Sequence, residues 1–343
     1  MITGMDRLVA AIKGERSDRI PVYCNLIDQG AWEMGMSPQE YFANGEYVAE
    51  AQLRMQARYG HDNVWSLFYV GKEAELLGCR KILYAKDGPP NVEDFVIKSY
   101  DDIHKLVVPE DVSAHPAFAE ELRCLRILKR EEGGKSPICA YISSTMTIPA
   151  MLMGMEKWLE LLFFGPATAR EELLAKCHDF FVKEVTAYRE GGADVLVYSN
   201  PFGSTDMVPM KYFLEYSLPW IEKDLQAVGT AGMVYYCGMA RLGKVLDIVR
   251  ERTGIGVFYL SPLDDISEGK RIIDGRALTC GVINDIKLID WSREEIRTEV
   301  KRMIDAGMPG GKFLFGTGVM PAYIPEENIR IMLEAAYEFG SYV

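Results

Sequence analysis

The feature that most constrains the fold is the alternation, along the whole chain, of short apolar segments with amphipathic helical segments. Eight apolar segments rich in Val, Ile, Tyr and Phe are bounded by turn residues, which predicts strands at 21–26, 63–69, 138–143, 195–200, 233–237, 256–261, 278–283 and 312–315. Six of them lack the polar alternation of a half-exposed strand. They therefore predict strands buried on both faces, as in a parallel sheet.

Helix start and stop signals lie between these segments. Residues 37–40 and 292–295 have the spacing of a capping box, and Gly60 and Gly307 are the corresponding stops. Further helical patterns cover 168–190, 239–252 and 325–339. Eight strand and helix units in alternation favour an α/β fold of one domain, residues 1–343, closed as a (β/α)8 barrel.

A plain barrel of this kind needs ~250 residues, so the chain has residues to spare. Met5, Leu8, Val9 and Ile12 predict an N-terminal amphipathic helix that leads into the barrel. The segment 71–135, with turn residues at 87–90, is too long for one crossover and predicts an insertion between the second and third strands. Such an insertion serves as a lid or a homodimer contact, or is only a surface excursion.

The charge and the cysteine usage exclude several classes of protein. Against 38 basic residues the chain carries 50 acidic ones, a net charge of −12, which argues against a nucleic-acid partner. The sequence has neither a long uncharged apolar stretch nor a signal peptide, so we expect no membrane insertion and no export. Its seven scattered cysteines include no CxxC pair, which favours reduced thiols and a cytoplasmic location.

In a parallel barrel the active site is built at the carboxyl ends of the strands. Polar and aromatic residues near these ends give the candidate site: Asn25, Asp28, His61, Asp62, Trp65, Tyr69, Tyr141, Tyr198, Asn200, Tyr235, Tyr236 and Cys237. Each has a structural alternative. Asp62 could cap a turn, His61 could be a surface histidine, and Cys237 could be a small buried hydrophobe. Asn200 and Asp285 occupy places where turn residues are expected in any case.

Several motifs resemble those of a known family. They are 7–14 followed by 18–22, 59–62 followed by 73–78, the tripeptide 236–238, and 323–328 near the end. Together they make the chain similar, over nearly its whole length, to the uroporphyrinogen decarboxylase superfamily, which includes corrinoid-dependent methyltransferases. The resemblance implies a barrel enzyme that moves a methyl group between a small methylated compound and a cobalt corrinoid carried by a partner protein.

The chain departs from the family in two places. The decarboxylases bind their polycarboxylate substrate with arginines after the first strand, where residues 25–30 here read Asn-Leu-Ile-Asp-Gln-Gly. Zinc-dependent methyltransferases of the family activate a thiol with a His and two Cys, where this chain has Tyr235, Cys237 and Val319. These residues argue against a zinc ion and against a thiol substrate, and they leave an aryl methyl ether or a methylated amine as the expected donor.

The resemblance assigns provisional roles to the candidate residues. Tyr235 or Asp62, with His61 beside it, would give a hydrogen bond or a proton to the leaving group, and Asn25 and Asn200 would orient the substrate. Asp28, Tyr236 and Cys237 would face the same mouth. Aromatic side chains could hold a flat ring or an ammonium, or could simply fill the barrel: Trp32, Trp65, Phe68, Tyr69, Tyr141, Tyr198, Phe202 and Tyr235. The alternatives are decarboxylation of a smaller acid, or binding of a tetrapyrrole or corrinoid without catalysis.

Overall fold

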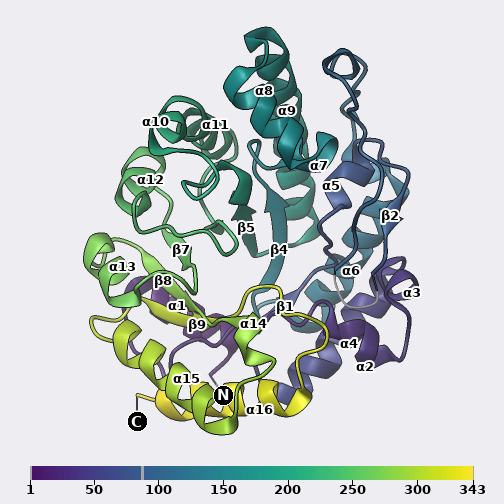
Figure 1. Cartoon of the computed structure of the whole chain (residues 1–343). Helices are drawn as coiled ribbons and strands as arrows, with labels where there is room; N and C mark the ends of the chain where they lie inside the picture. Colours follow the sequence, from purple (N-terminus) through teal and green to yellow (C-terminus); the bar gives the residue numbers. More distant parts are fainter. Residues whose placement is uncertain (1, 86–88, 343) are drawn as a thin grey trace.

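Seven parallel strands form one curled sheet in the computed structural model, which describes residues 2–85 and 89–342 (Figure 1). The strands follow one another around the sheet in chain order: β1 (Val64–Trp65), β4 (Ile138–Ser143), β5 (Val195–Ser199), β6 (Met233–Tyr236), β7 (Val257–Leu260), β8 (Leu278–Val282) and β9 (Phe313–Gly316). Val22 pairs in parallel with Phe315 of β9, and the N–H of Asp62 donates to the carbonyl of Val22 at 2.9 Å. The segment around Val22 therefore closes the sheet, and the predicted barrel is confirmed.

The first two predicted strands are shorter than the sequence pattern indicates. At Cys24 and Asn25, side-chain oxygens replace backbone carbonyls as hydrogen-bond acceptors, so the strand pairing ends there. The N–H of Cys24 donates to Asn63 Oδ1 at 3.0 Å, and the N–H of Asn25 donates to Thr317 Oγ1 at 2.8 Å. The second strand ends at Trp65, and the chain then turns, with the N–H of Lys72 bonded to the carbonyl of Tyr69.

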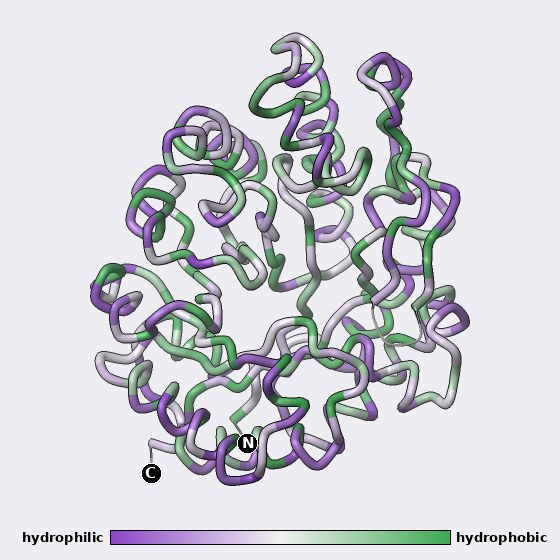
Figure 2. The backbone as a smooth tube through the Cα atoms, in the orientation of Figure 1, coloured by the Kyte–Doolittle hydropathy of each residue, from purple (hydrophilic) through white to green (hydrophobic). Residues whose placement is uncertain are grey.

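Helices surround the barrel, as Figure 1 shows, and hydrophobic and hydrophilic residues alternate along them (Figure 2). Many of their apolar residues are buried in the core. The helices are α1 (Gly4–Lys13), α2 (Gln29–Met34), α3 (Pro38–Phe42), α4 (Gly45–Tyr59), α7 (Ile148–Met153), α8 (Met155–Phe164), α9 (Ala167–Gly191), α10 (Met210–Tyr212), α11 (Leu218–Val228), α12 (Leu246–Thr253), α13 (Ile266–Ile273), α14 (Asp285–Leu288), α15 (Arg293–Gly307) and α16 (Glu326–Phe339). None of the helices in the described ranges has the length and apolar character that a membrane span needs.

Capping explains where several helices start. Both predicted capping boxes are formed, at Ser37 before α3 and at Ser292 before α15. The helical region expected to run from residue 37 to Gly60 is split, since Asn44 is extended and its side chain accepts the N–H of Glu46, which starts α4. The helix expected at 239–252 begins only at Leu246, because Asp264 binds the N–H groups of Leu242 and Gly243 and holds them in a loop.

The segment between β1 and β4 is the one expected as an insertion. It contains α5 (Lys72–Leu76), a short antiparallel pair β2 (Ile82–Leu83) and β3 (Asn91–Val92), two 3-10 turns (Tyr100–Asp102 and Val112–Ala114) and α6 (Pro116–Glu132). Of the turn expected at 87–90, residues 87 and 88 lie outside the described residues. Helix α6 packs on α4 and α9, so it serves as the crossover helix in front of β4.

Candidate active site

Ring contacts between strands show which side chains face the inside of the barrel. Tyr141 of β4 and Tyr236 of β6 are separated by β5, yet their rings lie 5.9 Å apart, so both point into the barrel. Tyr198 and Tyr235 are in register on β5 and β6, and their rings stack at 6.0 Å. Tyr198 also contacts Phe181 of α9, so this second pair points toward the helices. Neighbouring residues of a strand point to opposite faces, which is why Tyr235 and Tyr236 are separated.

The inward-facing residues form an aromatic cluster at the carboxyl ends of the strands, which we call the mouth. Trp65 stacks on Tyr141 with ring centroids 4.8 Å apart, and Phe68 packs on Tyr141 at 4.9 Å. Asn25 donates from Nδ2 to the hydroxyl of Tyr141 at 3.1 Å. Trp65 and Tyr141 are almost fully buried, whereas Phe68 and Tyr236 are half-buried and present the accessible ring surface. The structure thus brings Asn25, Trp65, Tyr141 and Tyr236 together.

Asp285 lies beside Tyr236 at this mouth. Asn284 caps α14 by accepting the N–H of Lys287, which places Asp285 as the first helical residue after β8. A methyl group built on Gly318, just after β9, would lie 3.1 Å from Asp285 Oδ2 and 3.4 Å from the hydroxyl oxygen of Tyr236. The two oxygens therefore converge on one point next to the aromatic rings. A side chain larger than glycine at 318 would occupy that point.

Burial sets the protonation of both groups. Asp285 is 6% exposed, and its burial raises the pKa of the carboxyl to about 6, against backbone N–H groups at the start of α14 that lower it. Burial and the nearby Asp285 raise the pKa of Tyr236, so its phenol keeps its proton at neutral pH. Asp285 can therefore gain or lose a proton just below neutral pH, whereas Tyr236 stays protonated and can donate a hydrogen bond. The sequence reasoning passed over Asp285 as a turn residue, although its position directly after a buried strand was a usable indication.

Asp28 follows the first strand segment at the same end of the barrel. Its side chain is 6% exposed at the start of α2, and burial raises the pKa of the carboxyl to about 7. It lies close enough to Tyr41 of α3 to influence the ionisation of that phenol. Asp28 is thus a second buried carboxyl that can hold a proton near neutral pH.

Three other predicted residues lie behind the strands. The hydroxyl of Tyr198 donates to Asp224 Oδ2 of α11 at 2.8 Å. Asn200 donates from Nδ2 to the hydroxyl of Tyr235 at 3.1 Å and accepts from Ser144 at 2.7 Å. All of these groups are fully buried, and burial raises the pKa of Tyr235 far above its ordinary value. Substrate contact at the mouth was expected for Tyr198, Asn200 and Tyr235. Their side chains instead bind groups on the helix side of the strands.

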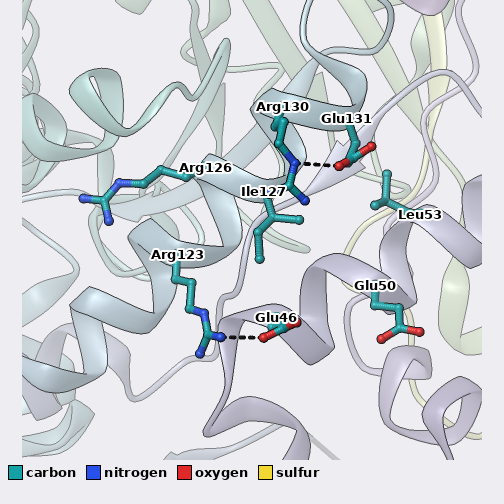
Figure 3. A pocket seen from close by; sticks show the side chains of 8 residues that line it. All are labelled: Glu46, Glu50, Leu53, Arg123, Arg126, Ile127, Arg130 and Glu131. Atoms are coloured by element: carbon teal, nitrogen blue, oxygen red, sulfur yellow. Dashed lines mark hydrogen bonds and ion pairs between the residues drawn. The ribbon is translucent and has the colours of Figure 1, made fainter.

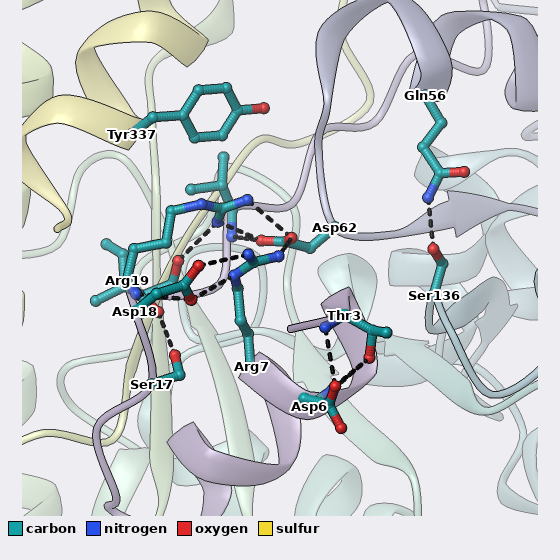
Figure 4. Close-up of polar contacts among 12 residues, drawn as sticks. Thr3, Asp6, Arg7, Ser17, Asp18, Arg19, Gln56, Asp62, Ser136 and Tyr337 are labelled. Atoms are coloured by element: carbon teal, nitrogen blue, oxygen red, sulfur yellow. Dashed lines mark hydrogen bonds and ion pairs between the residues drawn. The ribbon is translucent and has the colours of Figure 1, made fainter. Parts of the chain in front are cut away.

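Asp62 and His61 precede β1, at the amino end of the barrel, so the structure does not bring them to the mouth. Asp62 is 3% exposed and is held by Arg7 at 2.9 Å, by Arg19 at 2.5 Å and by the N–H of Val22 at 2.7 Å (Figure 4). Burial lowers the pKa of His61 to about 4, so its ring is neutral. This location argues against the acid/base role expected for Asp62 and His61. The two guanidinium groups of Arg7 and Arg19 also bind the carboxylate of Asp62, which leaves it paired.

Tyr69 is part of the segment between β1 and β4. Its hydroxyl is hydrogen-bonded to Glu75, and the ammonium group of Lys72 lies 4.8 Å from its ring centre. The side chain is 3% exposed and packs edge to face on Phe42 of α3, with ring centroids 5.7 Å apart. Within the part of the chain that the structure describes, Tyr69 makes no ring contact with Trp65 or Tyr141.

The residues at the family's zinc positions do not suit a zinc ion. Cys237 is a buried thiol and can supply one sulfur ligand. Tyr235 is turned to Asn200, and Val319 has no donor atom. Over residues 2–85 and 89–342, no three His, Cys, Asp or Glu side chains come together as a metal-binding group. Zinc ligation needs deprotonated thiols or imidazoles in a tetrahedral set, and this donor set does not supply one.

A surface groove between α4 and α6 is an alternative site for polar chemistry, with a volume of about 470 Å³ (Figure 3). Three arginines and three glutamates line it: Arg123, Arg126, Arg130, Glu46, Glu50 and Glu131. Ion pairs join Arg123 to Glu46 and Arg130 to Glu131. The charges balance, and exposed pairs of this kind stabilise little and bind little. The mouth therefore remains the candidate active site.

Comparison with known proteins agrees with the fold. The family model described as uroporphyrinogen decarboxylase (URO-D) matches residues 3–339. The methylcobamide:CoM methyltransferase MtbA of Methanosarcina mazei is 23% identical over 98% of both chains, and MtaA of Methanosarcina barkeri is 22% identical over 97% of both. A uroporphyrinogen decarboxylase of Geotalea uraniireducens is 23% identical over 74% of each chain. The solved structure of a methyltransferase from Methanosarcina mazei covers 99% of both chains with a TM-score of 0.85 at 22% identity.

Proposed function

Since the chain belongs to the uroporphyrinogen decarboxylase family, we propose that it is a methyltransferase that moves a methyl group between a small methylated compound and a corrinoid carried by a partner protein. The observation that carries the proposal is the mouth: aromatic rings beside a buried carboxyl that holds its proton up to about pH 6. The relatives that match over nearly their whole length are named as methylcobamide methyltransferases. Residues 25–30 lack the arginines that would bind a polycarboxylate.

The aromatic cluster selects a flat or cationic methyl donor. Phe68 and Tyr236 would contact it, and Trp65 and Tyr141 would hold these rings in place from below. Asn25 fixes the hydroxyl of Tyr141 through its 3.1 Å hydrogen bond, so the rings are positioned before the donor arrives. A methylammonium compound would be attracted by the ring faces as well.

Asp285 and Tyr236 would handle the proton of the leaving group. A reduced corrinoid supplies the electron pair that forms the new bond to the methyl carbon. With an aryl methyl ether, the electron pair of the broken C–O bond stays on oxygen, and that oxygen takes the proton of Asp285, directly or through the hydroxyl of Tyr236. With a methylammonium donor the amine leaves neutral and needs no proton, so ionised Asp285 would only attract the cation.

The rim of the mouth suits a protein partner. Exposed apolar side chains follow five different strand segments around it: Trp32, Met239, Leu263, Ile286 and Tyr323, with 42% to 60% of each exposed. Apolar groups arranged in this way around a polar centre mark an interaction surface. We propose that the corrinoid protein docks here, so that its corrinoid would face the mouth.

The test is a transfer assay with reduced corrinoid protein and a panel of methoxyarenes, methylamines and methylated thiols. The expected result is a change of the corrinoid spectrum with a methoxyarene or a methylamine. The change should be lost in Gly318→Leu with either donor, and in Asp285→Asn with the methoxyarene. Transfer to or from thiols only, together with stoichiometric zinc in the pure protein, would refute the donor class. Absence of transfer with every donor, with release of CO2 from a small acid or with corrinoid binding alone, would favour the decarboxylase or the carrier alternative.

A further inference from the structure

The first and the last segment of the barrel meet at the mouth through a side chain. Below the mouth they form a parallel ladder, in which the N–H of Phe315 donates to the carbonyl of Pro21 at 3.1 Å and that of Tyr23 to the carbonyl of Phe315 at 2.8 Å. The regular spacing of such a ladder would next join the N–H of Asn25 to the carbonyl of Thr317. That N–H donates instead to Thr317 Oγ1 at 2.8 Å. The hydroxyl of Thr317 therefore replaces its own carbonyl, and the ladder ends there.

The same hydroxyl holds the chain where the proton transfer is proposed. It donates to the carbonyl of Gly318 at 3.0 Å. Strand β9 has ended before this residue, so the side-chain hydrogen bond contributes to fixing the position of Gly318. A Cβ atom on Gly318 would lie 3.1 Å from Asp285 Oδ2 and 3.4 Å from the hydroxyl of Tyr236. The position of Gly318 thus sets the space in front of these two groups.

Asn25, the other partner of Thr317, leads to the aromatic cluster. Its Nδ2 donates to the hydroxyl of Tyr141 at 3.1 Å, and the ring of Tyr141 stacks on Trp65. Thr317 is 1% exposed and Asn25 is fully buried, so bulk water does not compete for the hydrogen bond between them. One hydroxyl group therefore connects the aromatic side of the mouth to its proton-transfer side.

Further hydrogen bonds hold the same two loops together beyond Gly318. Gln29 Nε2 donates to the carbonyls of Met320 at 3.1 Å and Pro321 at 2.7 Å. The N–H of Met320 also donates to the carbonyl of Asn25 at 3.4 Å. These contacts remain when the hydroxyl of Thr317 is removed, so we expect such a variant to keep the two loops joined and to fold.

We propose that Thr317 is a positioning residue of the methyl transfer: its hydroxyl fixes the separation between the aromatic cluster and the point beside Gly318. The inference rests on the proposed function, in which the donor lies against the rings while its leaving group reaches Asp285. A misplacement of about 1 Å can slow such a reaction by about 10²-fold. The rings still bind the donor in that case, so the loss should appear in kcat more than in KM.

The experiment compares Thr317→Val with Thr317→Ser, which keeps the hydroxyl, in methyl transfer between a methoxyarene and the reduced corrinoid protein. In Thr317→Val we expect kcat to fall by about tenfold or more, with the KM for the donor within about threefold of wild type. Thr317→Ser should keep both constants within about threefold. Wild-type kcat in Thr317→Val, or an equal loss in Thr317→Ser, would overturn the proposal.

Thr279→Val is the matched control for the loss of a buried hydroxyl. Thr279 of β8 is fully buried, and its hydroxyl donates to the carbonyl of Lys312 at 3.3 Å, at the amino end of the barrel. The same substitution there should leave kcat within about twofold of wild type. A loss in Thr279→Val as large as that in Thr317→Val would show that general loosening of the barrel is responsible, and would refute a positioning role.

Amide hydrogen exchange at Asn25 tests the connection without any donor. Thr317→Val removes the acceptor of this N–H, so its exchange should be about tenfold or more faster than in the wild-type protein and in Thr317→Ser. Unchanged exchange in Thr317→Val would refute the proposal. Absence of transfer with every donor in the wild-type protein would refute the proposed function instead, so the two failures are distinguishable. Thr317→Ala, which also lacks the hydroxyl, replaces Thr317→Val in both measurements if that variant does not fold.

Discussion

Replacing Asp62 with asparagine is expected to destabilise the fold and to leave the chemistry of the folded enzyme unchanged. The carboxylate accepts hydrogen bonds from Arg7, from both terminal nitrogens of Arg19 and from the N–H of Val22. These contacts join α1, the first strand segment and the start of β1 (Figure 4). Asparagine has nearly the same shape, but it removes the charge and turns an NH2 group toward a guanidinium or an N–H.

The size of the expected loss in the free energy of unfolding depends on which partners Arg7 and Arg19 retain in the variant. Arg7 retains Asp18 at 2.6 Å, whereas the guanidinium of Arg19 retains, among residues 2–85 and 89–342, the carbonyl of Ile20 and the ring of Tyr337. Breaking a buried ion pair by removing one partner costs about 3–5 kcal/mol. Because one arginine stays paired, we expect the lower end, a loss of about 3 kcal/mol in the free energy of unfolding. Asp18→Asn is the matched control: it faces the same Arg7 but is 39% exposed, and should cost about 1 kcal/mol or less.

The assay is urea unfolding of both variants at pH 7, together with the rate of methyl transfer per folded molecule. The expected outcome is a clearly lower midpoint for Asp62→Asn, a small change for Asp18→Asn, and transfer rates within twofold of wild type for both. A wild-type midpoint combined with a hundredfold slower transfer would show that Asp62 acts in proton transfer, and the placement of the active site at the mouth would then be wrong.

Two further predictions concern buried carboxyls. With an aryl methyl ether donor, the transfer rate should fall as the pH rises through about 6, where Asp285 loses its proton. The Asp285→Asn variant should lose this pH dependence and transfer the methyl group about 10²-fold more slowly or worse. With a methylammonium donor, the rate should instead rise as the pH rises through about 6. Glu184 of α9 is fully buried, and neither carboxylate oxygen has a partner. Burial raises the pKa of the Glu184 carboxyl in the folded protein above its value in the unfolded chain. The free energy of unfolding therefore keeps its full value below the unfolded pKa, where the carboxyl is protonated in both states, and decreases as the pH rises through the folded pKa. Glu184→Leu should therefore stabilise the protein by about 1–3 kcal/mol, and thermal unfolding should show a larger gain at pH 8 than at pH 5. The control is Glu171→Leu on the exposed side of α9, which should change stability by about 0.5 kcal/mol or less.

The sequence predicts the barrel because its information is local and repeated. Each strand is an apolar segment between turn residues, and capping residues such as Ser37 and Ser292 mark helix starts through contacts only three residues apart. The split at Asn44 and the late start at Leu246 were missed for opposite reasons. Asn44 acts locally through its cap, but the loop before Leu246 depends on Asp264, which is distant in sequence.

The site was predicted less well because strands buried on both faces hide the direction of their side chains. Tyr235 and Tyr236 are adjacent and equally apolar in context, and only pairing with β5 and contact with Tyr141 decide that Tyr236 faces inward. A shift of one residue in the alternation exchanges the two faces. A second uncertainty concerned the end of the barrel. His61 and Asp62 lie next to a strand, but they precede it, whereas Asp285 follows one.

The contrast between Asp62 and Asp285 is the reason why we place the proposed proton transfer at the carboxyl end of the barrel. Both aspartates are nearly buried, 3% and 6% exposed, but they satisfy their carboxyl groups differently. Asp62 is bound by two guanidinium groups, and an acid that gives up its proton to a substrate would have to break these contacts in every cycle. Asp285 has burial as the main influence on its pKa and shares an open point with Tyr236. A buried carboxyl without an ion-pair partner can change its protonation while the fold stays intact. In a parallel barrel, the loops after the strands can tolerate such a group, because the packing at the amino ends of the strands does not depend on it.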